Sequence, residues 1–119
     1  MPAEPVDLGP FGAFAADCPA RIAVDLFANR WTAVVVFVLK DGPMRPGRLR
    51  AEIGGISAKV LTETVRRLEF DGLVERREGA YALTPLGETL LEPIEGFGRW
   101  AAEHGDDVVA AQDRAARSA

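Results

Sequence analysis

The stretch that most constrains the fold runs from Gly54 to Gly72, with the sequence GGISAKVLTETVRRLEFDG. Its two leading glycines can take the positive φ angles of a sharp turn, and Ser57 can cap a following helix by accepting a backbone hydrogen bond. Leu61, Val65 and Leu68 recur at four and three residues, which predicts an amphipathic helix with one buried stripe. We interpret the stretch as the turn and second helix of a helix-turn-helix, the part that would enter a DNA major groove.

Length and composition are those of an ordinary one-domain protein. The chain has 119 residues, of which 48% are apolar and 27% charged, enough for a modest core. No apolar run approaches the ~20 residues of a membrane-spanning helix, and no signal-peptide pattern is visible. Cys18 is the one cysteine, so an internal disulfide is excluded, which fits a reducing compartment. We therefore expect a cytoplasmic protein with no membrane partner.

Charge is distributed unevenly along the chain. The formal net charge is −4, yet the segment from Arg45 to Arg77 holds eight basic side chains against five acidic ones. The negative total argues against indiscriminate binding to polyanions. A positive middle between acidic ends suits a protein that meets nucleic acid on one face only.

The rest of the chain predicts further helices and one hairpin around this stretch. Glu78-Gly79 between two short strand-like runs is a hairpin signal, and Thr84 followed by Pro85 is typical of a helix start. His104-Gly105 is typical of a helix end. The expected elements are a helix capped at Asp17, a buried helix over 31–39, a short helix over 46–53, the recognition helix from Ser57, strands over 73–77 and 80–84, and a helix from Pro85 to about Glu103.

This order predicts a mainly α fold with a small β-hairpin, a winged helix-turn-helix with helical extensions at both ends. Proline, glycine and small residues without a sustained period indicate a flexible N-terminal arm over 1–16. The winged domain and its flanking helices would occupy 17–104. Residues 105–119 would form a C-terminal tail that could add a frayed helix.

A series of short motifs resembles the HxlR-type bacterial transcription regulators, relatives of the MarR-like winged-helix group. The series follows the family's order and spans roughly 17–100, most of the chain. Its members are Cys18-Pro19, Asn29-Arg30-Trp31-Thr32, Gly42 with Arg45, Gly55-Ile56-Ser57-x-Lys59-x-Leu61-Thr62, Arg66-x-Leu68-Glu69-x-Asp71-Gly72-Leu73-Val74 and Leu83-Thr84-Pro85-Leu86-Gly87.

The resemblance implies a homodimer, with the N- and C-terminal helices as dimerisation helices, that binds operators in double-stranded DNA in the cytoplasm. Some members sense electrophiles or oxidants through a cysteine placed like Cys18. Two features depart from the family pattern. The hairpin is cut short at Arg77-Glu78-Gly79-Ala80, and Pro46-Gly47 follows Arg45 where the family often has an aromatic residue.

Candidate DNA-binding side chains divide into those placed for base edges and those placed for phosphates. Lys59 can donate to guanine O6 and N7, and Thr62 can offer a hydroxyl or a methyl group. The base-edge group is Ser57, Ala58, Lys59 and Thr62, and the phosphate group is Arg45, Arg48, Arg50, Arg66, Arg76 and Arg77, of which Arg66 could instead reach an outer base. The alternative for any one of the basic residues is a solvated charged side chain.

Other conspicuous side chains have a structural and a functional interpretation. Cys18 is either an inert, half-buried thiol or a redox sensor whose thiolate is favoured by a helix start. Ile22, Leu26, Trp31, Phe97 and Trp100 are candidates for core or dimer packing. A pocket at the dimer seam for an unidentified small-molecule effector is the minority alternative.

The sequence offers little for catalysis. One histidine and one cysteine lie far apart without metal-ligand spacing, and neither a phosphate-binding glycine loop nor a nucleophile elbow is present. We therefore expect no enzyme, no cofactor and no metal.

The expected function is sequence-specific DNA binding by a homodimeric transcriptional regulator, most simply a repressor, on a pseudo-palindromic operator. Two alternatives stay open. One is a winged-helix module that binds protein without DNA, and the other is a thiol-based sensor of oxidants or electrophiles acting through Cys18.

Overall fold

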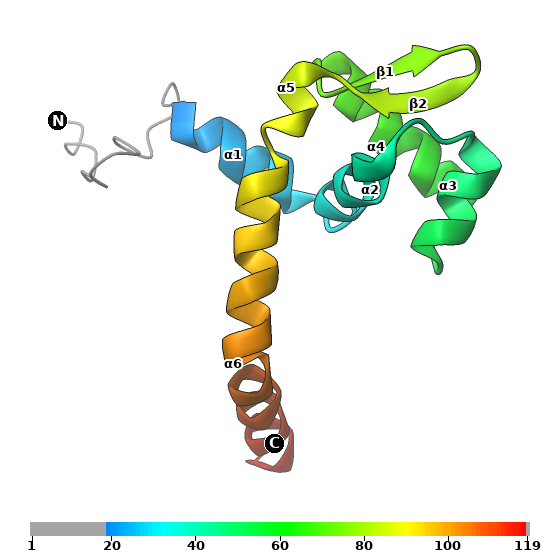
Figure 1. Ribbon diagram of the computed structural model, residues 1–119. Coiled ribbons are helices and arrows are strands. Elements are labelled where there is room, and N and C mark those ends of the chain that lie inside the picture. Colours follow the sequence, from blue (N-terminus) through cyan, green and yellow to red (C-terminus); the bar gives the residue numbers. More distant parts are fainter. Residues whose placement is uncertain (1–18, 119) are drawn as a thin grey trace, which may run out of the picture.

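The computed structural model describes residues 19–118, with side chains from Ile22 onwards. Its elements follow the predicted order up to the hairpin, with helices at both ends (Figure 1). They are α1 (Pro19–Ala28), α2 (Thr32–Val38), the 3-10 turn η2 (Leu39–Asp41), α3 (Pro46–Ile53), α4 (Ala58–Phe70), β1 (Val74–Arg77), β2 (Ala80–Leu83), α5 (Pro85–Glu88) and α6 (Leu91–Ser118). The predicted fold class, a mainly helical winged helix-turn-helix with one two-stranded hairpin, is confirmed.

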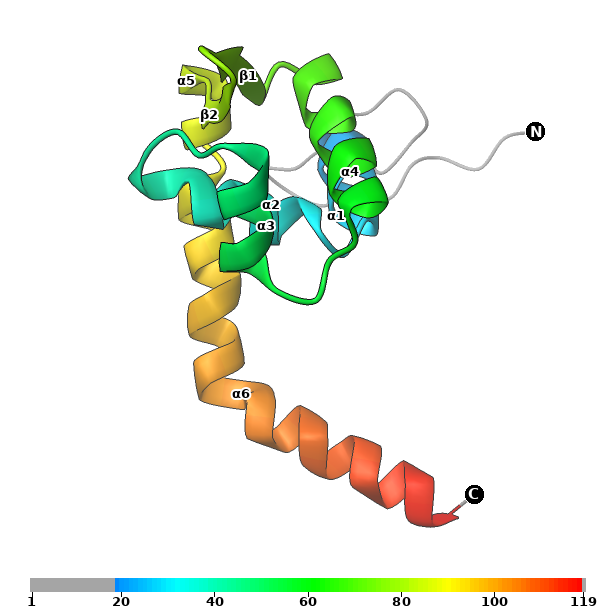
Figure 2. The same cartoon turned by 90° about the vertical axis from the view of Figure 1, so that its right-hand side faces the viewer.

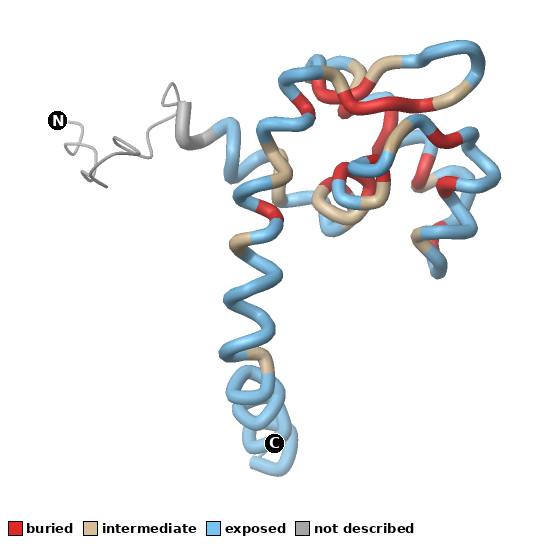
Figure 3. Tube along the Cα trace, viewed as in Figure 1, coloured by how far each residue is buried: buried red, intermediate tan, exposed pale blue. Residues whose placement is uncertain are grey.

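Buried residues gather where α2, α3, α4 and the hairpin meet, and the long helix α6 is exposed along most of its length (Figure 3). The apolar segment before the turn unit is therefore a core helix, as predicted. The core side chains are Val35, Val36, Leu39, Met44, Leu49, Ile56, Leu61, Val65, Leu68, Leu73, Val74, Tyr81, Leu83 and Ile94.

Helix α4 begins and ends at the residues that local chemistry predicts. The Ser57 hydroxyl accepts a hydrogen bond from the Val60 N–H at 3.1 Å, which satisfies one unpaired donor of the first turn. The buried Thr64 hydroxyl donates to the Val60 carbonyl at 2.8 Å, so the polar group inside the stripe is satisfied. After Asp71 the chain leaves the helix through Gly72, whose φ is +77°.

The hairpin turns through only two residues. Arg77 pairs with Ala80, and between them Glu78 and Gly79 take φ angles of +51° and +82°. Two consecutive positive φ angles are typical of a type I′ turn, whose twist matches that of the strands. The short wing predicted from Glu78-Gly79 is therefore present.

The C-terminal helix differs from its prediction in two ways. The expected single helix from Pro85 is divided into α5 and α6 by a turn at residues 89–90. A Cβ at Gly87 would lie 2.0 Å from the Leu73 carbonyl oxygen, so α5 is pressed directly against the chain entering β1. This close packing fixes the direction of α5, and the chain must turn before α6 can run away from the domain.

The expected end at His104-Gly105 is wrong, because α6 continues without a break to Ser118. A single glycine costs about 1 kcal/mol in a helix interior, and the alanine-rich residues beyond it offset that cost. Figure 2 shows that α6 changes direction in its orange section while remaining helical.

Candidate nucleic-acid interface

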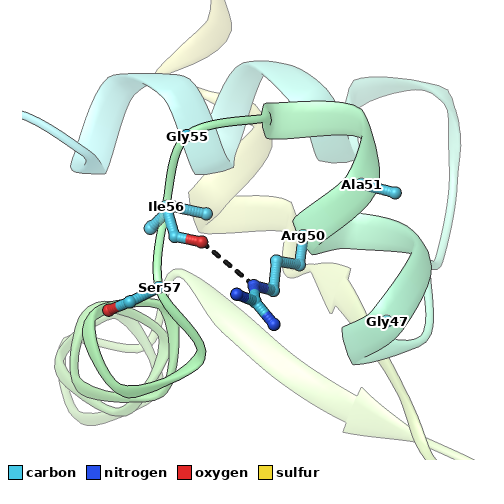
Figure 4. A pocket seen from close by; sticks show the side chains of 6 residues that line it. All are labelled: Gly47, Arg50, Ala51, Gly55, Ile56 and Ser57. Carbon is cyan, nitrogen blue, oxygen red and sulfur yellow. Dashed lines mark hydrogen bonds between the residues drawn. The ribbon is translucent and has the colours of Figure 1, made fainter.

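The turn between α3 and α4 is held by an arginine. Gly54 and Gly55 both have φ of +69°, and Ile56 after them is buried. The Arg50 Nε donates to the Ile56 carbonyl at 3.0 Å across the turn (Figure 4). This fixes the angle between the two helices and leaves the terminal nitrogens of the guanidinium for another acceptor.

An open hollow of about 590 Å³ lies beside this turn. Its lining residues are Gly47, Arg50, Ala51, Gly55, Ile56 and Ser57 (Figure 4). Sequence analysis placed Arg50 near the DNA backbone but missed its role in the turn. The position of Arg50 in the sequence could have indicated this role, because an arginine in the last turn of a helix can reach carbonyls that lack a helical partner.

The outer face of α4 carries predicted base-reading residues together with Arg66. Lys59, Thr62 and Arg66 are exposed and follow one another at three and four residues, so they share one side of the helix. The Thr62 hydroxyl donates to the Ala58 carbonyl at 2.9 Å. Its oxygen can still accept a hydrogen bond and its methyl group can contact a thymine methyl. The Ser57 oxygen accepts the capping hydrogen bond, and its hydroxyl hydrogen can still be donated to a base or a phosphate.

Ion pairs divide the predicted phosphate ligands into two sets. Arg48 lies 4.0 Å from Glu52, Arg76 lies 3.6 Å from Glu69, and Arg77 pairs closely with Glu75. Within residues 22–118, no such pair is formed by Arg45, Arg50, Lys59 or Arg66. The second set therefore carries positive charge that no neighbouring carboxylate neutralises.

Arg45 joins the start of α3 to the tip of the hairpin. A Cβ built on Gly79 would come within 3.0 Å of the Arg45 Nη1, so the guanidinium lies against the turn of the wing. A side chain at position 79 would push it away. The structure thus brings one predicted phosphate ligand to the wing tip although 34 positions separate Arg45 from Gly79 in the sequence.

The predicted packing residues fall into a group that packs on the core and a group that is exposed. Leu26 and Trp31 pack against the core, whereas Ile22, Phe97 and Trp100 are exposed, the last two at 62% and 55%. The Phe27 and Phe97 rings meet edge to face at 5.8 Å. Around this contact lies an apolar groove of about 1000 Å³, lined by Ala23, Val24, Phe27, Leu90, Pro93, Gly96, Phe97 and Trp100.

Three further expectations concern residues or chemistry outside this face. Cys18, the candidate redox sensor, lies outside the described residues. Within residues 19–118, no three His, Cys, Asp or Glu side chains are grouped to hold a metal ion. Over the same range no single helix could cross a membrane; only Ile22–Ala28 and Thr32–Asp41 together, bent by 87°, have the length and composition.

The fold and this face define a winged helix-turn-helix regulator. α3 and α4 form the helix-turn-helix, and the β1–β2 hairpin is its wing. Residues 26–108 match the model of the HxlR-like helix-turn-helix family, and the chain belongs to that family. Its members named below are transcriptional regulators, so the predicted resemblance is confirmed.

Similar proteins cover most of the chain. The uncharacterized HTH-type transcriptional regulator YtfH of Escherichia coli is 33% identical in an alignment of 110 residues that covers 87% of each chain. The structure of ytfH from Salmonella typhimurium aligns with a TM-score of 0.69 at 31% identity and covers 84% of this chain and 96% of that one. Quinone-bound YodB from Bacillus subtilis aligns with a TM-score of 0.68 at 34% identity, over 72% of this chain and 99% of that one.

Proposed function

We propose that this transcriptional regulator is a homodimer that binds a pseudo-palindromic DNA operator in a sequence-specific manner, most simply as a repressor inside the cell. The observation that carries the proposal is the outer face of α4. Lys59 and Arg66 are exposed there without a carboxylate partner among the described residues, and the Arg50–Ile56 hydrogen bond fixes the helix that presents them. A rigid helix with free donors is what direct base readout requires.

The two classes of contact would come from different elements. Ser57, Ala58, Lys59 and Thr62 would face base edges from the first two turns of α4. Arg45, Arg50 and Arg66 would bind phosphates and fix the register. Arg48 and Arg77 are weaker candidates for phosphates, since each already has a carboxylate partner.

The apolar groove between α1 and α6 supports the homodimer. Exposed aromatic side chains such as Phe97 and Trp100 are unfavourable in water, and a second copy would cover them. With two-fold symmetry, the two recognition helices would enter major grooves about 34 Å apart.

The substitution Phe97→Glu should shift the proposed homodimer to monomers, as measured by sedimentation velocity. The matched control is Phe70→Glu, which changes an exposed phenylalanine at the end of α4 and should leave the dimer intact.

Operator binding can be tested by fluorescence anisotropy with the intergenic DNA upstream of the gene, at several salt concentrations. The expected result is tight binding that survives an excess of random duplex and weakens steeply with salt. Failure to bind any genomic fragment would instead favour a protein-binding module, the first alternative.

The substitution Lys59→Ala distinguishes sequence-specific base contacts from sequence-independent electrostatic attraction to DNA. We expect it to change which operator variants are preferred, with a loss of about 1–3 kcal/mol at the base that it contacts. Lys40, which pairs with Asp41 at 3.4 Å, provides the matched lysine control. Equal losses on all sequences for Lys59→Ala would remove its base-reading role.

A small-molecule or thiol signal is a second candidate function, favoured by the similarity to quinone-bound YodB. In this chain the signal would act through Cys18. Cys18→Ser should then abolish the response of operator binding to oxidants or quinones without altering the affinity of the reduced protein. An unchanged response would assign Cys18 a structural role.

A further inference from the structure

One carboxylate oxygen in the recognition helix is shielded from solvent and accepts no hydrogen bond from the described residues. It is the Oε1 of Glu69, in the last turn of α4. Its partner is the guanidinium of Arg76 on β1, with Nε 3.6 Å from that oxygen. The Glu69 side chain is 31% exposed and that of Arg76 is 59% exposed, but this one oxygen is shielded and has the guanidinium as its cation. The ion pair therefore constrains where β1 lies relative to α4.

The same guanidinium group of Arg76 also contacts the second strand, β2. Arg76 and Tyr81 are direct partners in the β1–β2 register. The Arg76 Nη2 donates to the Tyr81 hydroxyl at 3.1 Å, and the guanidinium carbon lies 5.1 Å from the centre of the ring. One side chain thus binds an acidic group on α4 and an aromatic ring on β2.

Tyr81 extends the connection to α3. Its N–H donates to the Met44 carbonyl at 2.8 Å, and its carbonyl accepts from the Met44 N–H at 2.9 Å. Met44 immediately precedes Arg45, the residue before α3 that lies against the wing tip. Glu69, Arg76 and Tyr81 therefore link α4, the hairpin and the entrance to α3, the parts of the proposed DNA-binding face.

We propose that Arg76 is a positioning residue, and that the Glu69–Arg76–Tyr81 cluster sets the angle between the wing and the recognition helix. The inference rests on the proposed function and changes the role predicted for Arg76 as a phosphate ligand. A guanidinium that is neutralised by Glu69 and packed on Tyr81 contributes little to counterion release. To bind a phosphate it would have to leave Glu69 unpaired.

Glu69→Gln distinguishes the two roles by the sign of its effect. If Arg76 were a phosphate ligand, removing the competing carboxylate would add positive charge and tighten DNA binding. If the cluster positions the wing, the same substitution weakens operator binding by up to about 5-fold, which corresponds to the free energy of a partly exposed ion pair. Glu63→Gln is the matched control, because Glu63 is exposed on α4 and forms no ion pair among the described residues.

The salt dependence gives a second, independent readout. Arg76→Ala should lower the affinity at every salt concentration and leave the slope of log K against log salt unchanged. Arg66→Ala should lower the magnitude of that slope by about one. Adding Glu69→Gln to Arg76→Ala should cause no further loss, since both remove the same pair. Tighter binding by Glu69→Gln, or a flattened slope for Arg76→Ala, would overturn the proposal.

Amide hydrogen exchange in the free protein separates this proposal from the proposed function. Glu69→Gln and Arg76→Ala should speed exchange across β1 and β2 while the amides of α2 keep their protection. Unchanged exchange in the hairpin would refute the cluster even if the wild-type protein binds its operator. Failure of the wild-type protein to bind any DNA would refute the proposed function, and exchange would still decide whether the cluster holds the wing.

Discussion

The helix-turn-helix unit and the long helix α6 use apolar side chains in opposite ways. In α4 the apolar stripe of Leu61, Val65 and Leu68 is buried within the chain itself. Helix α6 is exposed along most of its length (Figure 3). Only Ile94 in it is buried, and Phe97 and Trp100 are exposed. The apolar side chains of the first region are buried in the core, whereas the second region presents apolar side chains to solvent.

The same contrast holds for polar groups. Around α4 the caps, turns and ion pairs connect elements that are distant in sequence, as in the Arg50–Ile56 and Arg76–Glu69 contacts. Along α6 beyond Gly105 every described residue is exposed, and the Ser118 hydroxyl donates to the Arg114 carbonyl of the same helix. We therefore expect the region around α4 to keep a fixed geometry. We expect the end of α6 to adapt to the surface that it contacts.

The largest effect is expected where α5 touches β1. Gly87→Ala would place a Cβ 2.0 Å from the Leu73 carbonyl oxygen, and backbone must move to relieve it. We expect a loss of about 3 kcal/mol, the upper end of the usual overpacking range, measured by urea denaturation. Gly98→Ala in α6, where a Cβ meets nothing within 4 Å, is the control and should not destabilise the protein. Equal losses at both sites would remove the distinction between the two regions.

A matched pair of valines tests burial alone. Val65 in α4 is fully buried and Val109 in α6 is 54% exposed. Val65→Ala should lower the free energy of unfolding by about 2 kcal/mol through lost burial and a residual cavity, and Val109→Ala by less than about 0.5 kcal/mol. Thermal denaturation at several protein concentrations measures both. A penalty at Val109 that grows with concentration would show that a second copy covers this part of α6.

The helix cap at Ser57 should have an intermediate effect. Ser57→Ala removes the acceptor of the Val60 N–H, which costs about 1 kcal/mol of stability. Ser57→Asp retains an acceptor at the same position and should restore most of that stability in the same denaturation experiment. If Ser57→Ala is neutral, the start of α4 is fixed by tertiary packing and not by its cap.

The smallest effect has the opposite sign. Gly105 lies inside α6 with free space around its Cα, so Gly105→Ala should raise helicity and stabilise the protein by about 0.5–1 kcal/mol. Circular dichroism and thermal denaturation would show both changes. A destabilised variant would indicate that the helix ends at Gly105 in solution, as the sequence predicts.

Local chemistry made most of the fold predictable. Ser57, Thr84 and Glu78-Gly79 act through neighbours one to three residues away, so caps and the two-residue turn follow from the sequence alone. The apolar run from Trp31 is predicted as a buried helix over 31–39. That prediction is confirmed, since this segment supplies Val35 and Val36 to the core.

What sequence could not predict depends on contacts between distant segments. The turn between α5 and α6 follows from the packing of Gly87 on Leu73, which no periodicity reveals. Likewise, Glu69 and Arg76 look like separate solvated charges until the hairpin folds back onto α4. Glycine at position 105 is a helix-end signal only when nothing helical follows, and here an alanine-rich segment does.

The length and direction of α6 determine where a label can be attached to this protein. Its 28 residues would span about 42 Å if straight, and its C-terminal end lies far from the hairpin and the outer face of α4 (Figure 1). A dye, a surface tether or a fused reporter attached at Ser118 would therefore sit away from the proposed operator. Single-molecule recordings could then follow binding and release without masking the face that makes the contact.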